Sequence, residues 1–179
     1  MSKLVVLFSL LMGISVFRTC AQDNVVSTTK GEITFFSSAP LEDIEAQNKR
    51  VISMLNTQNL ELMVRVPINQ FEFQNKLMQQ HFNDNYLESE KYPYATFKGK
   101  LAEELDFSKP GTYDASANGL LNIHGVEQKR TLNGKLTVAP DGSVQLITKF
   151  TVALVDHKID IPKIVFNKIA EKIAVSANF

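Results

Sequence analysis

The chain has 179 residues, a length that favours one domain over two. Its 19 lysine and arginine residues balance 19 aspartate and glutamate residues, which excludes the strongly basic composition of proteins that bind nucleic acid or anionic membrane surfaces. Because Cys20 is the single cysteine, the chain cannot form an internal disulfide, and its stability must come from a hydrophobic core.

Residues 1–21 have the pattern of a secretory signal peptide, in which a basic start is followed by an apolar stretch from 4 to 17 and a cleavage after Ala21. This apolar stretch is shorter than the roughly 20 residues of a transmembrane helix. An alternative makes Cys20 a lipidated N-terminus, although the residues before it fit a lipobox poorly. We therefore predict a cysteine-free mature domain at 22–179, located in the periplasm or outside the cell.

Most of the mature chain alternates apolar and polar residues, which is the pattern of β-strands with one buried face. For example, Val64 and Val66 share one face, and Arg65 lies on the other. This pattern predicts strands at 31–38, 48–57, 60–67, 94–106, 111–124, 129–139, 143–152 and 173–179. The intervening segments are short and rich in turn-forming residues, which favours antiparallel hairpins over crossover connections.

Two stretches depart from this alternation. Residues 71–93 carry apolar residues at helical spacing up to Phe82, and Pro93 ends any helix there. They predict one or two short helices between two strands. A smaller helical piece is predicted within 40–47.

About eight strands in series with a short helical insert predict a mainly β, antiparallel fold that is either a closed barrel or a sandwich. The apolar faces of a barrel can surround the interior or, in a membrane barrel, face lipid. We favour the inward orientation, because the chain has no tryptophan for interfacial girdles and several strands carry lysine or arginine opposite their aliphatic face. The protein is therefore not expected to be integral to a membrane.

Catalytic and metal-binding motifs are not found in the sequence. The histidines His81, His124 and His157 are far apart and form no HExxH pair, and the serines lie outside any G-x-S-x-G motif. We predict no enzyme activity, no metal and no cofactor. His81 is expected to be a helix-face histidine with one partner, and His157 a surface group near a loop.

His124 ends a predicted strand just before Gly125, which suits a turn residue with positive φ. Three roles stay open for its imidazole: a hydrogen bond to the backbone at the end of a hairpin, a polar contact to a ligand headgroup at the mouth of a cavity, or a general base.

Two segments together carry a resemblance to a known family: KYPYATFKGKL at 91–101 and NGLLNIHGVEQKRTLNGKLTV at 118–138. With the F-x-F and helical segment at 71–82 and IDIP at 159–162, the chain resembles the YceI-like family of bacterial secreted lipid-binding proteins over about 29–179. The usual HGVT-K of the family is replaced here by HGVEQK, which puts a headgroup role for that turn in doubt.

The resemblance implies a lipocalin-like antiparallel barrel whose central apolar cavity holds, in some members, a polyisoprenoid chain. It also implies a periplasmic or secreted protein without enzyme activity. The partner is then an apolar lipid of the isoprenoid class. The residues that we expect to contact it are Val64, Val66, Phe71, Phe73, Phe97, Leu121, Ile123, Leu146 and Phe150, with His124 near the mouth.

Two other functions stay open from the sequence. One is a structural or interaction module whose barrel core is filled by side chains and binds no lipid. The other is a hydrolase or isomerase that acts on a bound lipid through His124 or His81. The oligomeric state is also open, with a homodimer as one alternative.

Overall fold

The computed structural model describes residues 24–162 and 167–179, so the predicted signal peptide at 1–21 lies outside the described residues. The strands in this part of the chain are β1 (Val25–Ser38), β2 (Asp43–Asn56), β3 (Glu61–Pro67), β4 (Glu72–Phe73), β5 (Tyr94–Leu101), β6 (Gly111–Ile123), β7 (Val126–Val138), β8 (Val144–Ala153) and β9 (Lys172–Asn178). The helical segments described are η1 (Ile68–Gln70), α1 (Lys76–His81), η2 (Phe82–Tyr86) and η3 (Leu154–His157).

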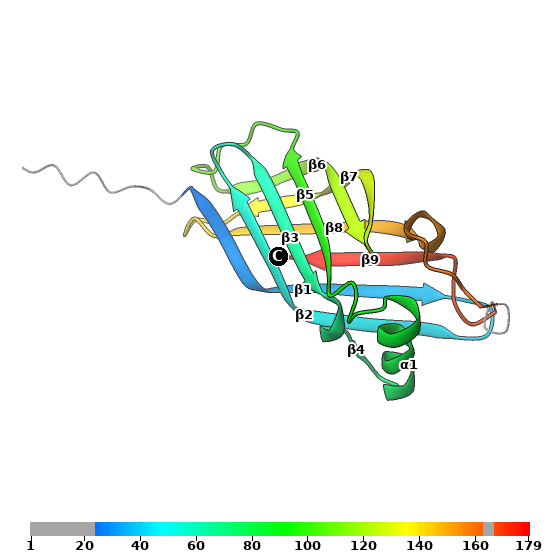
Figure 1. Ribbon diagram of the computed structural model, residues 1–179. Helices are drawn as coiled ribbons and strands as arrows, with labels where there is room; N and C mark the ends of the chain where they lie inside the picture. Colours follow the sequence, from blue (N-terminus) through cyan, green and yellow to red (C-terminus); the bar gives the residue numbers. More distant parts are fainter. Residues whose placement is uncertain (1–23, 163–166) are drawn as a thin grey trace, which may run out of the picture.

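Eight of the described strands form one closed antiparallel barrel (Figure 1). Around the barrel the order is β1–β9–β8–β7–β6–β5–β3–β2, and the pairing of β1 with β2 closes the ring. The two-residue β4 is added to β2, where Phe73 lies opposite Ala46. This arrangement confirms the predicted mainly β barrel and decides against the sandwich. Each of the eight strands has a partner on both sides over at least part of its length, so closure of the barrel covers much of the strand edges.

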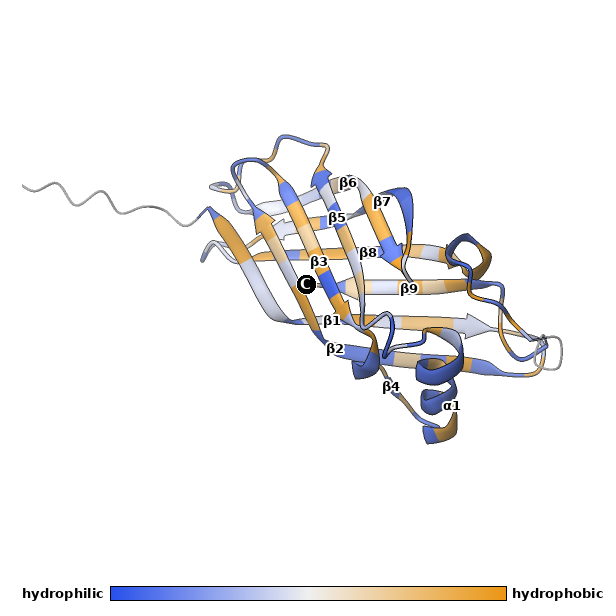
Figure 2. Ribbon diagram, viewed as in Figure 1, coloured by the Kyte–Doolittle hydropathy of each residue, from blue (hydrophilic) through white to orange (hydrophobic). Residues whose placement is uncertain are grey.

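The apolar faces of the strands point into the barrel, as predicted. On β3, for example, Val64 and Val66 are buried, whereas Met63 and Arg65 are exposed. Figure 2 shows the same pattern along the barrel strands, where hydrophobic bands are interrupted by hydrophilic ones. This period of two residues is what a pleated strand with one buried face requires.

The β6–β7 connection is a two-residue turn formed by His124 and Gly125, with φ of 54° and 72°. Two successive positive φ angles are characteristic of the type I′ turn, whose twist matches that of the flanking strands. The predicted turn at this position is therefore confirmed. Its backbone conformation determines where the His124 side chain points.

Several of the predicted boundaries were wrong. The first strand was expected at 31–38, whereas β1 already begins at Val25. The helical piece expected within 40–47 is instead the beginning of β2, which starts at Asp43. Its acidic residues concealed a strand pattern in which Ile44 and Ala46 face inward, and pairing with β1 stabilises it. The strand expected at 94–106 ends at Leu101.

The helical insert lies between β4 and β5, against one end of the barrel (Figure 1). Asn75 caps α1, because its side-chain oxygen accepts hydrogen bonds from the backbone N–H groups of Leu77 and Met78. The prediction of one or two short helices in 71–93 is confirmed. None of the helices in the described residues has the length and apolar character needed to cross a membrane.

Candidate functional site

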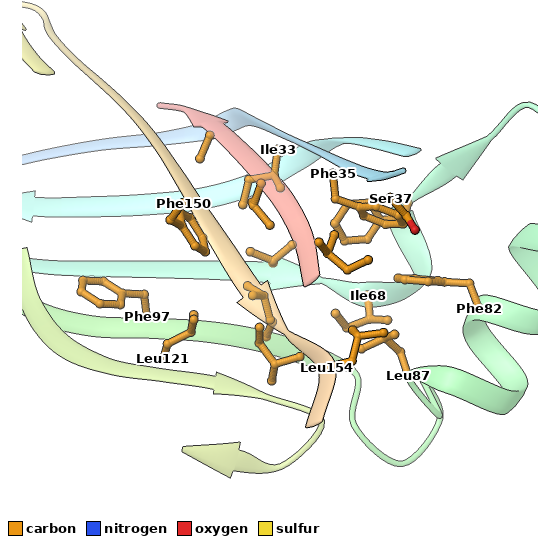
Figure 3. A pocket seen from close by; sticks show the side chains of 18 of the residues that line it. Ile33, Phe35, Ser37, Ile68, Phe82, Leu87, Phe97, Leu121, Phe150 and Leu154 are labelled. Atoms are coloured by element: carbon orange, nitrogen blue, oxygen red, sulfur yellow. The ribbon is translucent and has the colours of Figure 1, made fainter. Parts of the chain in front are cut away.

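An apolar cavity of about 550 Å³ lies inside the barrel (Figure 3). Each of the eight barrel strands contributes inward-facing side chains to its lining, and α1, η2 and η3 contribute further residues at one end. The volume falls within the roughly 300–1,000 Å³ that is common for small-molecule sites. The interior of this barrel is therefore hollow, not filled by packed side chains.

The structure places nine of the ten nominated contact residues in the lining of this cavity. They are Val64, Val66, Phe71, Phe73, Phe97, Leu121, Ile123, Leu146 and Phe150. Figure 3 shows Phe97, Leu121 and Phe150, which come from three different strands, directed toward one common space. That these side chains contact a ligand stays a prediction. The tenth residue, His124, is not among the described residues that line the cavity.

Several lining residues were missed by the sequence reasoning. Phe35 could have been found, because it alternates in phase with Ile33 on a predicted strand. Ala115 and Ala117 on β6 could not be found in this way, because alanine is too small to stand out in an alternating pattern of large apolar residues. Their small side chains nevertheless leave much of the cavity open. Ile159 lies in the lining because the chain after β8 folds back over the barrel end, which no local pattern predicts.

Four phenylalanine rings form a cluster where the helical insert meets the barrel. Phe82 of η2 lies 5.5 Å from Phe35, 5.4 Å from Phe71 and 5.0 Å from Phe73, measured between ring centroids. Figure 3 shows Phe82 extending from the insert toward the barrel wall. Aromatic pairs at such separations add about 0.5–1.5 kcal/mol each to the free energy of burial. Phe82 thus attaches the insert to the barrel through three aromatic contacts.

We expect Phe82→Ala to loosen the insert while the barrel stays folded. Because Phe82 is only half-buried, the free energy of unfolding should fall by about 1–2 kcal/mol, less than the 3–5 kcal/mol typical of a buried phenylalanine. Amide hydrogen exchange should speed up mainly in residues 76–86. Leu77→Ala, at an exposed position of α1, is the matched control. Unchanged exchange in Phe82→Ala would show that other contacts hold the insert.

Two buried hydroxyl groups in the cavity wall are already engaged within the protein. The Ser37 hydroxyl oxygen accepts a hydrogen bond of 2.9 Å from the backbone N–H of Ala170. The Thr148 hydroxyl donates one of 2.6 Å to the backbone oxygen of Asn133. Because these groups have found partners, the wall offers few hydrogen bonds to a ligand, and burial of apolar surface would dominate binding.

The ionisable side chains in the described lining are Glu42, His81, Tyr86 and Lys168. The carboxylate and the ammonium group balance each other in formal charge. The ring nitrogen Nδ1 of His81 lies 2.9 Å from the side-chain nitrogen of Asn85, so His81 is a helix-face histidine with one partner, as predicted. These four side chains make part of the lining more polar than the aliphatic and aromatic remainder.

His124 is held beside the barrel by several neighbours. Its Nε2 lies 2.7 Å from a carboxylate oxygen of Glu88, its Nδ1 lies 3.3 Å from the backbone oxygen of His157, and its ring packs edge-on against Tyr92 at 4.6 Å. The hydrogen bond from His124 holds the pKa of the Glu88 carboxyl below its usual range. These contacts connect the β6–β7 turn to the segments around Glu88 and His157.

The prediction that His157 is a surface group was wrong, because its side chain is completely buried. Lys158 adopts a positive φ of 55° after η3, and the chain there folds over the β6–β7 turn. In that position Nδ1 of His157 lies 3.1 Å from the backbone oxygen of Val126, whereas Nε2 is buried without a partner among the described residues. Burial lowers the pKa of His157, which keeps the ring neutral.

Comparison with solved structures supports the fold. The chain is similar to a polyisoprenoid binding domain from Saccharophagus degradans implicated in plant cell wall breakdown, with 14% identity, a TM-score of 0.71, and coverage of 88% of this chain and 97% of that one. It is similar to BcnA of Burkholderia cenocepacia, with 14% identity, a TM-score of 0.67, and coverage of 83% and 94%. A Campylobacter jejuni YceI protein has 16% identity, a TM-score of 0.53, and coverage of 98% and 96%.

No curated protein matches the chain. At identities this low, the structural likeness shows only a shared fold. The sequence itself matches the family model of the YceI-like domain over residues 15–179. Since this match covers the whole barrel, from β1 to β9, the chain belongs to the YceI-like family.

Proposed function

We propose that this protein is a secreted or periplasmic binding protein that holds a long apolar lipid of the polyisoprenoid class and catalyses no reaction. The observation that carries the proposal is the apolar cavity, to which all eight strands of the described barrel contribute. A protein of the same fold is described as a polyisoprenoid binding domain, which supports this class of ligand. The signal-peptide pattern at 1–21 supports export.

Hydrophobic burial supplies enough free energy for such binding. Each buried CH₂ group contributes about 0.8 kcal/mol, so a chain of about 20 carbons contributes roughly 16 kcal/mol. This gain offsets an association cost of about 4–15 kcal/mol. A lipid of this kind therefore needs a dry, apolar space more than it needs specific hydrogen bonds.

We propose that the nine nominated lining residues contact the hydrocarbon chain. The headgroup of the lipid would lie in the polar part of the cavity, near Glu42, His81 and Lys168. The apolar wall then selects for chain character, and the three ionisable side chains select for a headgroup that is small and polar.

Catalysis on a bound lipid has less support. The 2.7 Å contact between His124 and Glu88 is the kind of pair that a general base needs, but neither residue lines the cavity. His81 does line the cavity, and its hydrogen-bonding partner is the amide of Asn85, which cannot take up a proton as a carboxylate does. Binding without reaction therefore fits the site better than a hydrolase or isomerase.

Native mass spectrometry of the full chain, expressed with its own leader, tests the proposal. We expect a polyprenyl lipid to copurify, or a stoichiometric mass shift to appear when polyprenyl lipid is added. The same spectrum distinguishes a chain that begins at Gln22 from one with a lipidated Cys20, and it reports whether a homodimer forms. An empty protein that shows no shift at saturating lipid would sink the proposal.

A further inference from the structure

Three large hydrophobic side chains are strongly exposed at one end of the barrel. Leu41 is 70% exposed, Leu77 is 59% exposed and Val155 is 79% exposed, the highest values among the large hydrophobic residues in the part of the chain that the structure describes. A single exposed hydrophobic side chain is common on a protein surface, whereas several that gather at one place can mark an interaction site. The position of these three residues relative to the cavity therefore matters.

The three residues lie on segments that border the cavity. Leu41 lies in the turn between β1 and β2, Leu77 in α1 and Val155 in η3. Figure 1 shows these three segments at the same end of the barrel. Leu77 lines the cavity itself, and Glu42 and Leu154, the chain neighbours of the other two, also line it. We call Leu41, Leu77 and Val155 the exposed apolar rim, because one of the three lines the cavity and the other two are next to residues that do.

The charges around this rim do not favour an anionic partner. In the described segments around the rim, four cations are accompanied by five anions: Lys76, Lys158, Lys168 and Lys172 against Glu42, Asp43, Asp156, Asp160 and Glu171. Binding driven by anionic lipids or acidic proteins needs clustered positive charge, which these described segments do not carry. The apolar side chains must therefore supply most of the attraction.

We propose that this apolar rim rests on the surface of a lipid bilayer and that lipid passes through it between the bilayer and the cavity. The transfer step rests on the proposed function. A long polyisoprenoid resides in a bilayer, and its path into the cavity avoids water only where apolar groups border the opening. Apolar side chains on three separate short segments can each insert among lipid headgroups, and the balanced charges suit a zwitterionic bilayer.

Tryptophan fluorescence tests docking independently of lipid binding, because the chain contains no tryptophan. In Val155→Trp, phosphatidylcholine vesicles should shift the emission to shorter wavelength, and high salt or added phosphatidylglycerol should change the shift little. Ile147→Trp, at an exposed position on the outer face of β8, is the matched control and should show no shift. No shift in Val155→Trp, or equal shifts in both variants, would overturn the proposal.

Transfer kinetics test the role of the rim. We expect Leu41→Asp with Val155→Asp to slow the uptake of polyprenyl lipid from phosphatidylcholine vesicles about tenfold, a change that corresponds to about 1.4 kcal/mol. Uptake from detergent micelles should stay unchanged. The matched control, Leu120→Asp with Ile147→Asp, alters exposed residues on the barrel wall and should leave both rates unaltered.

The outcomes separate the two proposals. If no variant takes up polyprenyl lipid from micelles or vesicles, the proposed function fails, and the emission of Val155→Trp still decides whether the rim docks on a bilayer. Normal uptake from vesicles by the rim variant would overturn the docking proposal. So would a loss of dimers in the rim variant on size-exclusion chromatography, because the rim would then be an interface between two copies of the chain.

Discussion

Ala117→Phe is expected to abolish lipid binding while the barrel remains at least as stable as the native protein. Ala117 is 4% exposed, lines the cavity from β6, and lies between Leu101 on β5 and Leu132 on β7. A phenylalanine ring at this position projects into open space, where it buries apolar surface that contributes about 25 cal/mol per Å². The ring occupies the volume that the hydrocarbon chain of the ligand needs.

Affinity for a polyprenyl lipid should fall at least about a hundredfold, which corresponds to about 2.8 kcal/mol. Titration followed by native mass spectrometry measures the affinity, and thermal unfolding measures the stability. Leu120→Phe is the matched control, because Leu120 is on the same strand but is exposed on the outer face of the barrel. It should change neither quantity appreciably.

The stability of Ala117→Phe distinguishes a hollow barrel from a filled one. In a filled core, an added ring forces neighbouring side chains off their rotamers and typically costs about 1–3 kcal/mol. In a cavity of about 550 Å³, the ring meets little resistance. A destabilised variant would support the structural module with a filled core. A stable variant that still binds lipid would show that the ligand lies elsewhere.

The sequence predicted the barrel well because alternation is a local property. Each strand can bury one face only if apolar residues recur every second position, so Val64 and Val66 on β3 or Leu146 and Phe150 on β8 reveal both the strand and its inner side. Seven of the nine candidate contact residues that line the cavity lie on strands predicted in this way, whereas Phe71 and Phe73 lie in the stretch that departs from alternation. The start of β2 shows the limit, since residues 40–47 were predicted as a helical piece although β2 begins at Asp43.

Alternation does not predict whether the interior is filled. That depends on the volume left after all inner faces meet, to which small residues such as Ala115 and Ala117 contribute as much as large ones. Contacts between distant segments were also beyond the sequence. Phe82 meets Phe35 across 47 positions of the chain, and the burial of His157 depends on a return of the chain over the β6–β7 turn.

Acidification from pH 7 to pH 5 is expected to destabilise the protein through His157. Burial lowers the pKa of this histidine below its ordinary value near 6.5. The unfolded chain therefore binds a proton at a higher pH than the folded protein does, and the free energy of unfolding falls as the pH falls through this window. The loss is at most about 1.4 kcal/mol per pH unit, and it ends below the pKa of the folded state.

The groups that face His157 do not remove this effect. Asp156 raises its pKa and Arg130 lowers it, but both contributions are smaller than that of burial. Its backbone oxygen accepts from His124, which does not alter the ring. The carboxyl groups with lowered pKa, such as Asp106 at about 2, lose their stabilising interactions only as the pH falls below about 4. The pH range in which His157 affects stability is thus separate from the range in which the carboxyl groups do.

Urea unfolding between pH 5 and pH 8 measures the effect, with His157→Asn and His157→Ala as a pair. Asparagine can still donate a hydrogen bond to the Val126 oxygen but does not titrate, so His157→Asn should lose most of the pH dependence above pH 5. His157→Ala leaves that oxygen unpaired beside a new cavity, and its free energy of unfolding should fall by about 3 kcal/mol at pH 8. Because Leu154 and Ile159, on either side of His157, line the cavity, we expect protonation of the ring also to loosen one end of it. An equal pH dependence in the native protein and His157→Asn would assign the transition to another group.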